Sequence, residues 1–175
     1  MDDELHHIAE ELEIKYGINS YFYPGISLVE IGGIQRELKE AKELAQKNNI
    51  EPTLEFYRGY LELKREIIEL IMQDKELTAK IEEYNKGVVG LEVPSILLFA
   101  TPVIYILYDC VIKPYCQGYF HKLGELRAEE KYKQIKKNIS NKAKKLSSER
   151  DREIIQLIIN KLLEKYFLTK DNKHR

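Results

Sequence analysis

Cysteine, proline and glycine are scarce in this sequence of 175 residues, which contains two, five and nine of them respectively. Two cysteines cannot build the disulfide framework of a small secreted domain. So little proline and glycine excludes a collagen-like chain, and a hydrophobic content of 43% excludes a disordered one. The composition is instead typical of one soluble globular domain, long enough to bury a core without disulfides or metals.

The start of the chain lacks the basic residues and the apolar stretch that a secretory signal requires. The two cysteines, Cys110 and Cys116, are most simply interpreted as reduced thiols. Both features lead us to expect a cytoplasmic protein.

Motifs for nucleophilic catalysis and phosphate binding are also missing: there is no Gly-x-Ser-x-Gly, no Gly-x-Gly-x-x-Gly and no Walker loop. Cys110, Cys116 and His121 converge only if the chain reverses direction between them, and the two cysteines are further apart than in known zinc sites. A di-metal carboxylate site needs two Glu-x-x-His pairs, and Glu4 with His7 is the single one. We therefore expect no metal and no cofactor.

Apolar residues recur with a helical period along most of the chain, which predicts an all-α protein. We expect one domain spanning residues 1–175, a bundle of about six helices that ends in a frayed tail at residues 169–175. Residues 53–86 keep one apolar phase and can form a single long helix, with residues 73–76 as the most suitable place for a kink or turn. Residues 18–31 lack the helical period, so we expect an irregular aromatic loop there, with a short hairpin as the alternative.

The most apolar stretch lies at residues 93–112, where the sixteen residues from Val93 to Tyr108 carry no charge, and we expect its helix at residues 94–112. A membrane-spanning helix needs about 20 apolar residues, so this length favours a central helix buried by its neighbours, with membrane insertion as the alternative. Pro102 in its middle predicts a kink or a split near Ala100.

A block of lysines at residues 131–145 contains no acidic residue. If this block is helical, Lys133, Lys137 and Lys144 share the side opposite the apolar residues. Such a face can bind phosphates, an acidic protein or an anionic membrane, or can simply be solvated. Because the block has no arginine, base-specific reading of a nucleic acid is not expected.

Asp109 is the most notable single residue, because it follows the apolar segment directly. A buried acid needs a partner or a raised pKa, and such acids in clefts are candidate catalytic groups. The alternative is an exposed acid that pairs with Lys113 one helical turn later. Asp109 and His121 are thus the catalytic candidates of this sequence, in an aromatic region that includes Tyr21, Tyr23, Tyr105 and Tyr119.

Two functional hypotheses follow from these patterns. We favour a non-enzymatic interaction or regulatory module whose lysine-rich face binds a polyanion, such as nucleic acid without sequence preference, or an acidic protein. The alternative is an enzyme for a small molecule with its site around Asp109 and His121. We also expect a homodimer. The acidic residues 1–13 and the basic residues 131–145 are complementary in charge and can meet within one chain or across two. The long amphipathic segment of residues 53–86 can also bury more surface than one bundle of this size covers.

Overall fold

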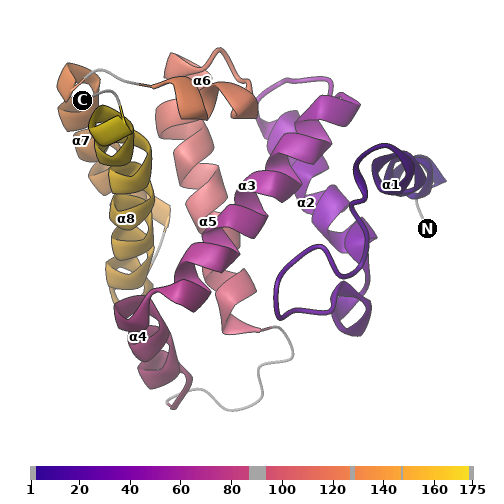
Figure 1. Ribbon diagram of the computed structural model, residues 1–175, viewed down its shortest axis with the longest axis horizontal. Coiled ribbons are helices and arrows are strands. Elements are labelled where there is room, and N and C mark those ends of the chain that lie inside the picture. The colour runs from indigo at the N-terminus through magenta and orange to yellow at the C-terminus, as the bar shows by residue number, and fades with distance from the viewer. Residues whose placement is uncertain (1–2, 87–93, 127–128, 147, 174–175) are drawn as a thin grey trace. The chain divides into compact units, whose positions relative to one another are not determined.

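The computed structural model describes residues 3–86, 94–126, 129–146 and 148–173, and every regular element in these ranges is helical (Figure 1). The prediction of an all-α fold is therefore confirmed. Eight α-helices occur in the described ranges, against about six expected, and three short segments, η1, η2 and η3, are 3-10 or π-helical. The bounds of the α-helices are α1 (Asp3–Tyr16), α2 (Ile34–Lys47), α3 (Leu54–Gln73), α4 (Lys75–Lys86), α5 (Ser95–Leu107), α6 (Lys113–Tyr115), α7 (Glu129–Leu146) and α8 (Glu149–Lys173).

The chain, for which we expected one domain, divides into two compact units. Unit 1 comprises Met1–Glu66 and unit 2 comprises Ile67–Arg175, so that α3 runs from one into the other. Each unit is described by itself below.

In unit 1, α1 ends at Tyr16 because Gly17 takes a positive φ of 68°, a conformation that terminates helices. Residues 18–31 contain turns and the short helix η1 (Leu28–Ile31) but no strand, so the loop is confirmed and the hairpin alternative is wrong. Three of its apolar side chains are buried, those of Ile18, Tyr23 and Leu28. These anchors pack the loop on the helices of unit 1.

The long helix expected over residues 53–86 is broken once, at Asp74, within the segment predicted to bend. Asp74 caps the start of α4: the Leu77 amide donates to Asp74 Oδ1 at 3.0 Å, and Thr78 Oγ1 donates to the Asp74 carbonyl at 2.9 Å. The capping bond to Leu77 and, after it, the bond from Lys161 lower the pKa of Asp74. The break thus has a local cause in the sequence.

In unit 2, the buried apolar helix expected at residues 94–112 is present as α5 and the π-helical turn η2 (Tyr108–Ile112). Val103, Ile104, Ile106 and Leu107 are fully inaccessible to solvent. Ser95–Tyr115 is long and apolar enough to cross a membrane, but 67% of its most apolar part is buried inside the protein. The helix continues through Pro102, so the predicted split near Ala100 is wrong.

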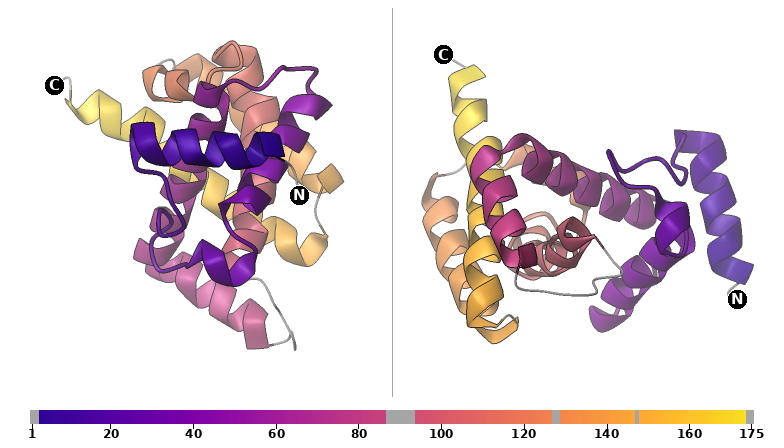
Figure 2. Two further views of the ribbon diagram at one scale, coloured as in Figure 1. Left: turned by 90° about the vertical axis from the view of Figure 1, so that its right-hand side faces the viewer. Right: turned by 90° about the horizontal axis from the view of Figure 1, so that it is seen from below.

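The helices α7 and α8 lie side by side, with α5 against both of them (Figure 2). The apolar side chains of both helices are buried. On α7 they are Ile135, Ile139 and Ala143, and on α8 they lie between Ile154 and Leu163. The helix α8 extends to Lys173, beyond the boundary at residue 168 that the sequence suggested.

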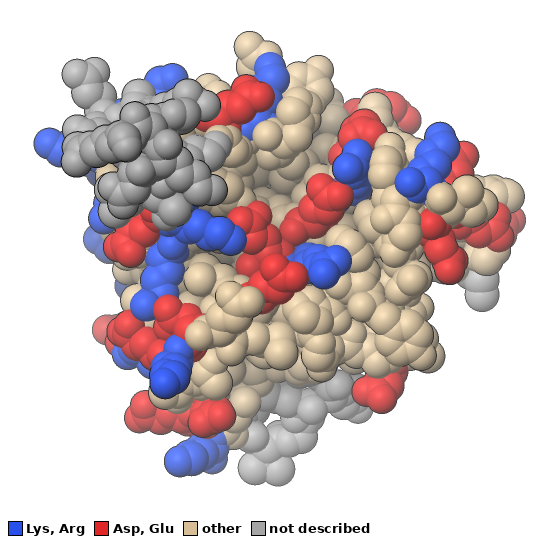
Figure 3. Space-filling model, viewed as in Figure 1, with Lys and Arg blue, Asp and Glu red and all other residues tan. Residues whose placement is uncertain are grey.

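Charged side chains of both signs are interspersed where α4 meets α8, at the lower left of Figure 3. Lys80 Nζ lies 2.7 Å from Glu153 Oε1, and Lys161 Nζ lies 2.9 Å from Asp74 Oδ2 and 3.1 Å from Glu76 Oε2. Ion pairs that water can reach, as it can here, usually add little stability.

Candidate functional site

The lysine face, which we define as Lys133, Lys137 and Lys144 of α7, is exposed to solvent. At 100° per residue, the three side chains fall within about 40° around the helix, opposite the buried Ile135 and Ile139. Lys133 and Lys144 are eleven positions apart, or about 16 Å along the helix axis. No ion pair to any of the three occurs among the residues whose side chains the structure describes. The helix therefore presents a row of uncompensated ammonium groups.

Three of the four lysines that flank this face have local partners in unit 2. Lys142 Nζ lies 3.0 Å from Asp109 Oδ2. Lys136 Nζ lies 4.7 Å from the ring centre of Tyr132, and Lys131 Nζ lies 5.9 Å from that of Tyr115. These contacts attract the flanking charges toward the body of unit 2. Lys131, Lys136 and Lys145 are exposed as well, so the solvent-facing charge of α7 extends beyond the lysine face.

Asp109 and His121, the catalytic candidates, have ordinary surroundings. The Asp109 side chain is 29% exposed, and its ion pair is with Lys142 of α7 rather than with the neighbouring Lys113 considered above. His121 is exposed, with its ring 5.6 Å from the ring of Tyr119. An acid held in an ion pair and an exposed imidazole supply no evident nucleophile or general base.

Cys110 and Cys116 are buried free thiols. Burial is the main cause that raises the pKa of each to about 11, and the charge of Asp109 adds to it for Cys110 and that of Glu125 for Cys116. A thiol with such a pKa is almost fully protonated at neutral pH and is a poor nucleophile and metal ligand. Within the described ranges, no three His, Cys, Asp or Glu residues are grouped to hold a metal ion.

Unit 1 contains a feature that the sequence patterns do not predict, a cluster of buried charges. Lys64 of α3 and Glu37 of α2 are 1% and 2% exposed. Lys64 Nζ lies 2.8 Å from Glu37 Oε1 and 2.9 Å from Glu37 Oε2, and 2.9 Å from Glu40 Oε2. Tyr60 donates to the same Glu40 oxygen at 3.3 Å, and Tyr23 is buried nearby. One buried ammonium thus faces two carboxylates, of which Glu37 is buried and Glu40 is partly exposed.

Helical phase carries the signal that could have revealed this cluster. Lys64 lies three residues after Leu61 and four before Ile68, so a charged residue occupies the apolar stripe of α3. Glu37 occupies the matching position on α2, four residues before Ala41. A lysine and a glutamate in the stripes of two adjacent helices are compatible with burial only if they pair.

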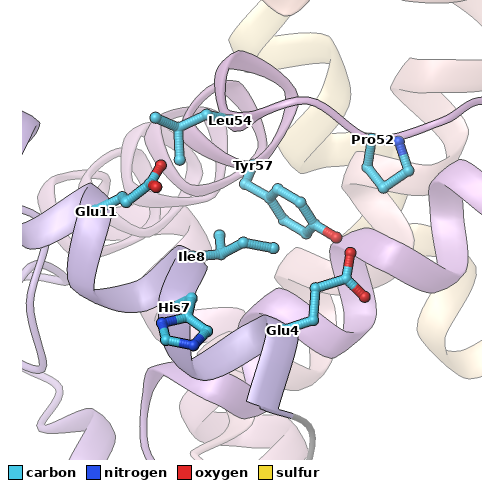
Figure 4. Close-up of a pocket in the computed structure, with 7 residues that line it drawn as sticks. All are labelled: Glu4, His7, Ile8, Glu11, Pro52, Leu54 and Tyr57. Atoms are coloured by element: carbon cyan, nitrogen blue, oxygen red, sulfur yellow. The ribbon is translucent and has the colours of Figure 1, made fainter.

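A groove of about 480 Å³ lies beside α1 in unit 1 (Figure 4). Figure 4 shows Ile8 and Tyr57 pointing toward each other across it, while carboxylates stand at its rim. Glu4 on this rim is paired with Lys42, at 3.2 Å. The groove is lined by Glu4, His7, Ile8, Glu11, Pro52, Leu54 and Tyr57. This volume suits a small ligand.

Comparison with protein-family models, with curated proteins and with solved structures yields no match, so every functional argument below depends on this chain's own residues.

Proposed function

We propose that this protein is a non-enzymatic binding module that uses the lysine face of α7 to bind a polyanion. The observation that carries the proposal is the exposure of Lys133, Lys137 and Lys144 on one side of a helix whose other side is buried. Because α7 is packed against both α5 and α8, the row of charges is held on a firm support.

Electrostatics explains why such a row binds phosphates. Each phosphate neutralised by a lysine releases condensed counterions, so the gain in free energy is largest at low salt. Three contacts give an affinity for double-stranded nucleic acid that falls about 40-fold between about 50 mM and 200 mM salt. Lysine presents a compact charge and not a planar fork, so binding is expected to be indifferent to base sequence.

The test is a salt titration of fluorescent single- and double-stranded DNA and RNA against two variants. The first variant replaces Lys133, Lys137 and Lys144 with Glu, and we expect it to lose binding with a nearly unchanged thermal midpoint, because the three side chains are exposed. The matched control replaces three exposed lysines outside α7, namely Lys15, Lys39 and Lys86, with Glu.

The control has the same net charge as the first variant, so it separates a local binding face from a general effect of charge. We expect it to keep most of the wild-type affinity. Equal loss of affinity in both variants would contradict the proposal, and so would a wild type that at low salt binds neither nucleic acid nor an acidic peptide. Binding of an acidic peptide but of no nucleic acid would keep the lysine face and change the class of partner.

The enzyme hypothesis gains no support from the geometry around Asp109 and His121. Asp109 pairs with Lys142, and the groove of unit 1 includes neither candidate. The binding module is therefore the function that we carry forward.

A further inference from the structure

The groove of unit 1 has an apolar lining, which we define as Ile8, Pro52, Leu54 and Tyr57. The first three side chains are half-buried, and Tyr57 is buried. Because these side chains surround a hollow of about 480 Å³, part of their apolar surface stays in contact with water. A small ligand that covers this surface therefore gains free energy from its burial.

The two carboxylates at the rim of the groove differ in their partners. Lys42 Nζ of α2 lies 3.2 Å from Glu4 Oε2 and balances the charge of Glu4. Glu11 is exposed and has no ion pair among the described residues. Seven positions of α1, or about 10 Å, separate the two residues, and Figure 4 shows them at opposite ends of the groove with Ile8 between them. One end of the groove is thus close to neutral, and the other end carries a negative charge.

The charge around the groove determines the sign of the ligand that it favours. None of the seven described residues that line it is a lysine or an arginine. Unit 1 contains 14 Asp and Glu residues against eight Lys and Arg residues, which gives it a net charge of −6. A field of this sign attracts cations and repels anions.

We propose that this groove binds a small amphipathic cation, a primary amine on an apolar body, whose ammonium group pairs with Glu11 while its body covers the apolar lining. A neutral apolar molecule leaves the carboxylate without a partner, and an anion is repelled by it. A cation without an apolar body gains only an ion pair in contact with water, which contributes little. The proposal concerns unit 1 alone and is independent of the lysine face, which lies in unit 2.

NMR titration of the full-length protein with hexylamine tests the proposal. We choose about pH 8, at which histidine side chains are neutral and primary amines are charged. The signals of Ile8, Leu54 and Tyr57 should shift with a Kd of about 1 mM, as expected for so small a ligand. Butylamine has two fewer methylene groups and should bind more weakly, by up to about 15-fold. Hexanol has the same body without the charge and should bind more weakly than hexylamine, by up to about fivefold.

Two variants separate a specific ion pair from a general effect of charge. Glu11→Gln keeps the size of the side chain and removes its charge, so that hexylamine should bind it no better than hexanol does. Glu13→Gln is the matched control, because Glu13 is also an exposed carboxylate of α1 but lies about 160° from Glu11 around the helix. It changes the net charge equally and should keep the preference for the amine. Because both residues are exposed, both variants should fold like the wild type.

Three results of this experiment would overturn the proposal. They are a hexylamine titration that shifts no signal of the apolar lining, a wild type that binds hexanol as tightly as hexylamine, and equal weakening by Glu11→Gln and Glu13→Gln. Signals of the groove that shift with protein concentration and not with the amine would overturn it as well, because a second copy of the chain would then occupy the groove.

Discussion

Replacing Lys64 with Met should destabilise the protein more than any other change to a single lysine. The side chain is 1% exposed and holds two carboxylates at 2.8–2.9 Å. Methionine has a similar length and apolar stem, so the loss of packing is small and the missing charge dominates. Removing one partner of a buried ion pair costs about 3–5 kcal/mol, because the charge that remains has neither water nor a counterion.

Urea unfolding provides the measurement. With a slope of about 2 kcal/mol per M, a loss of 3–5 kcal/mol lowers the midpoint by about 1.5–2.5 M without changing the slope. Lys39→Met is the control, since Lys39 is an exposed lysine of α2, and its effect should stay within about 0.5 kcal/mol. The loss in Lys64→Met should shrink at acidic pH, where Glu37 and Glu40 take up protons.

A compensating variant separates the loss of charge from the loss of shape. Lys64→Met combined with Glu37→Met and Glu40→Gln removes every charge of the cluster, and it should recover most of the lost stability, because an apolar replacement of a whole buried ion pair is often neutral or favourable. If this triple variant is destabilised as much as Lys64→Met, the loss of packing, and not the loss of charge, causes the destabilisation. A loss below about 1 kcal/mol in Lys64→Met alone would refute the reasoning about the buried ammonium.

Three further predictions concern other parts of the chain. Asp74→Ala removes the cap of α4 and should cost about 1 kcal/mol at neutral pH in thermal or urea unfolding. The contribution of Asp74 to stability is complete above its ordinary pKa of 3.8 and is lost as the pH falls through the lowered pKa of the folded state. A destabilisation by Asp74→Ala that persists in strong acid would contradict this prediction. Cys110 and Cys116, with pKa values of about 11, should react slowly with a thiol reagent at about pH 8 in the native protein and rapidly in urea, and rapid native reaction would contradict their burial. The homodimer expected from charge complementarity should be seen by light scattering at micromolar concentration, and a monomer at that and higher concentrations would remove it.

Periodicity in the sequence predicts the helices and their ends where the cause is local. Gly17 ends α1 through its positive φ, and Asp74 separates α3 from α4 through its cap. The buried central helix follows from a run without charges, because no other environment suits so many apolar side chains outside a membrane. Each of these features depends on a few residues that are close together in the chain, so it can be predicted from the sequence alone.

The sequence does not predict the features that depend on residues far apart in the chain. A split at Pro102 is the local expectation, but the residues around it in α5 are buried by neighbouring elements, and this packing outweighs one missing hydrogen bond. Leu98, whose carbonyl loses its helical donor to Pro102, is 40% exposed, so this break in the ladder falls on a side of the helix that water can reach. The π-helical turn η2 likewise has no marker in the local sequence.

Lysine burial in this chain follows position relative to the apolar stripe of a helix, and composition alone cannot show it. Lys64 lies in the stripe of α3 and is 1% exposed, which is possible only because Glu37 occupies the stripe of α2. Lys142 lies at the edge of the stripe of α7; its side chain is 36% exposed and pairs with Asp109. Lys133 lies opposite the stripe and is exposed. Lysine therefore occurs in a buried charge cluster, in an ion pair and on an exposed helix face, and its position around the helix decides which.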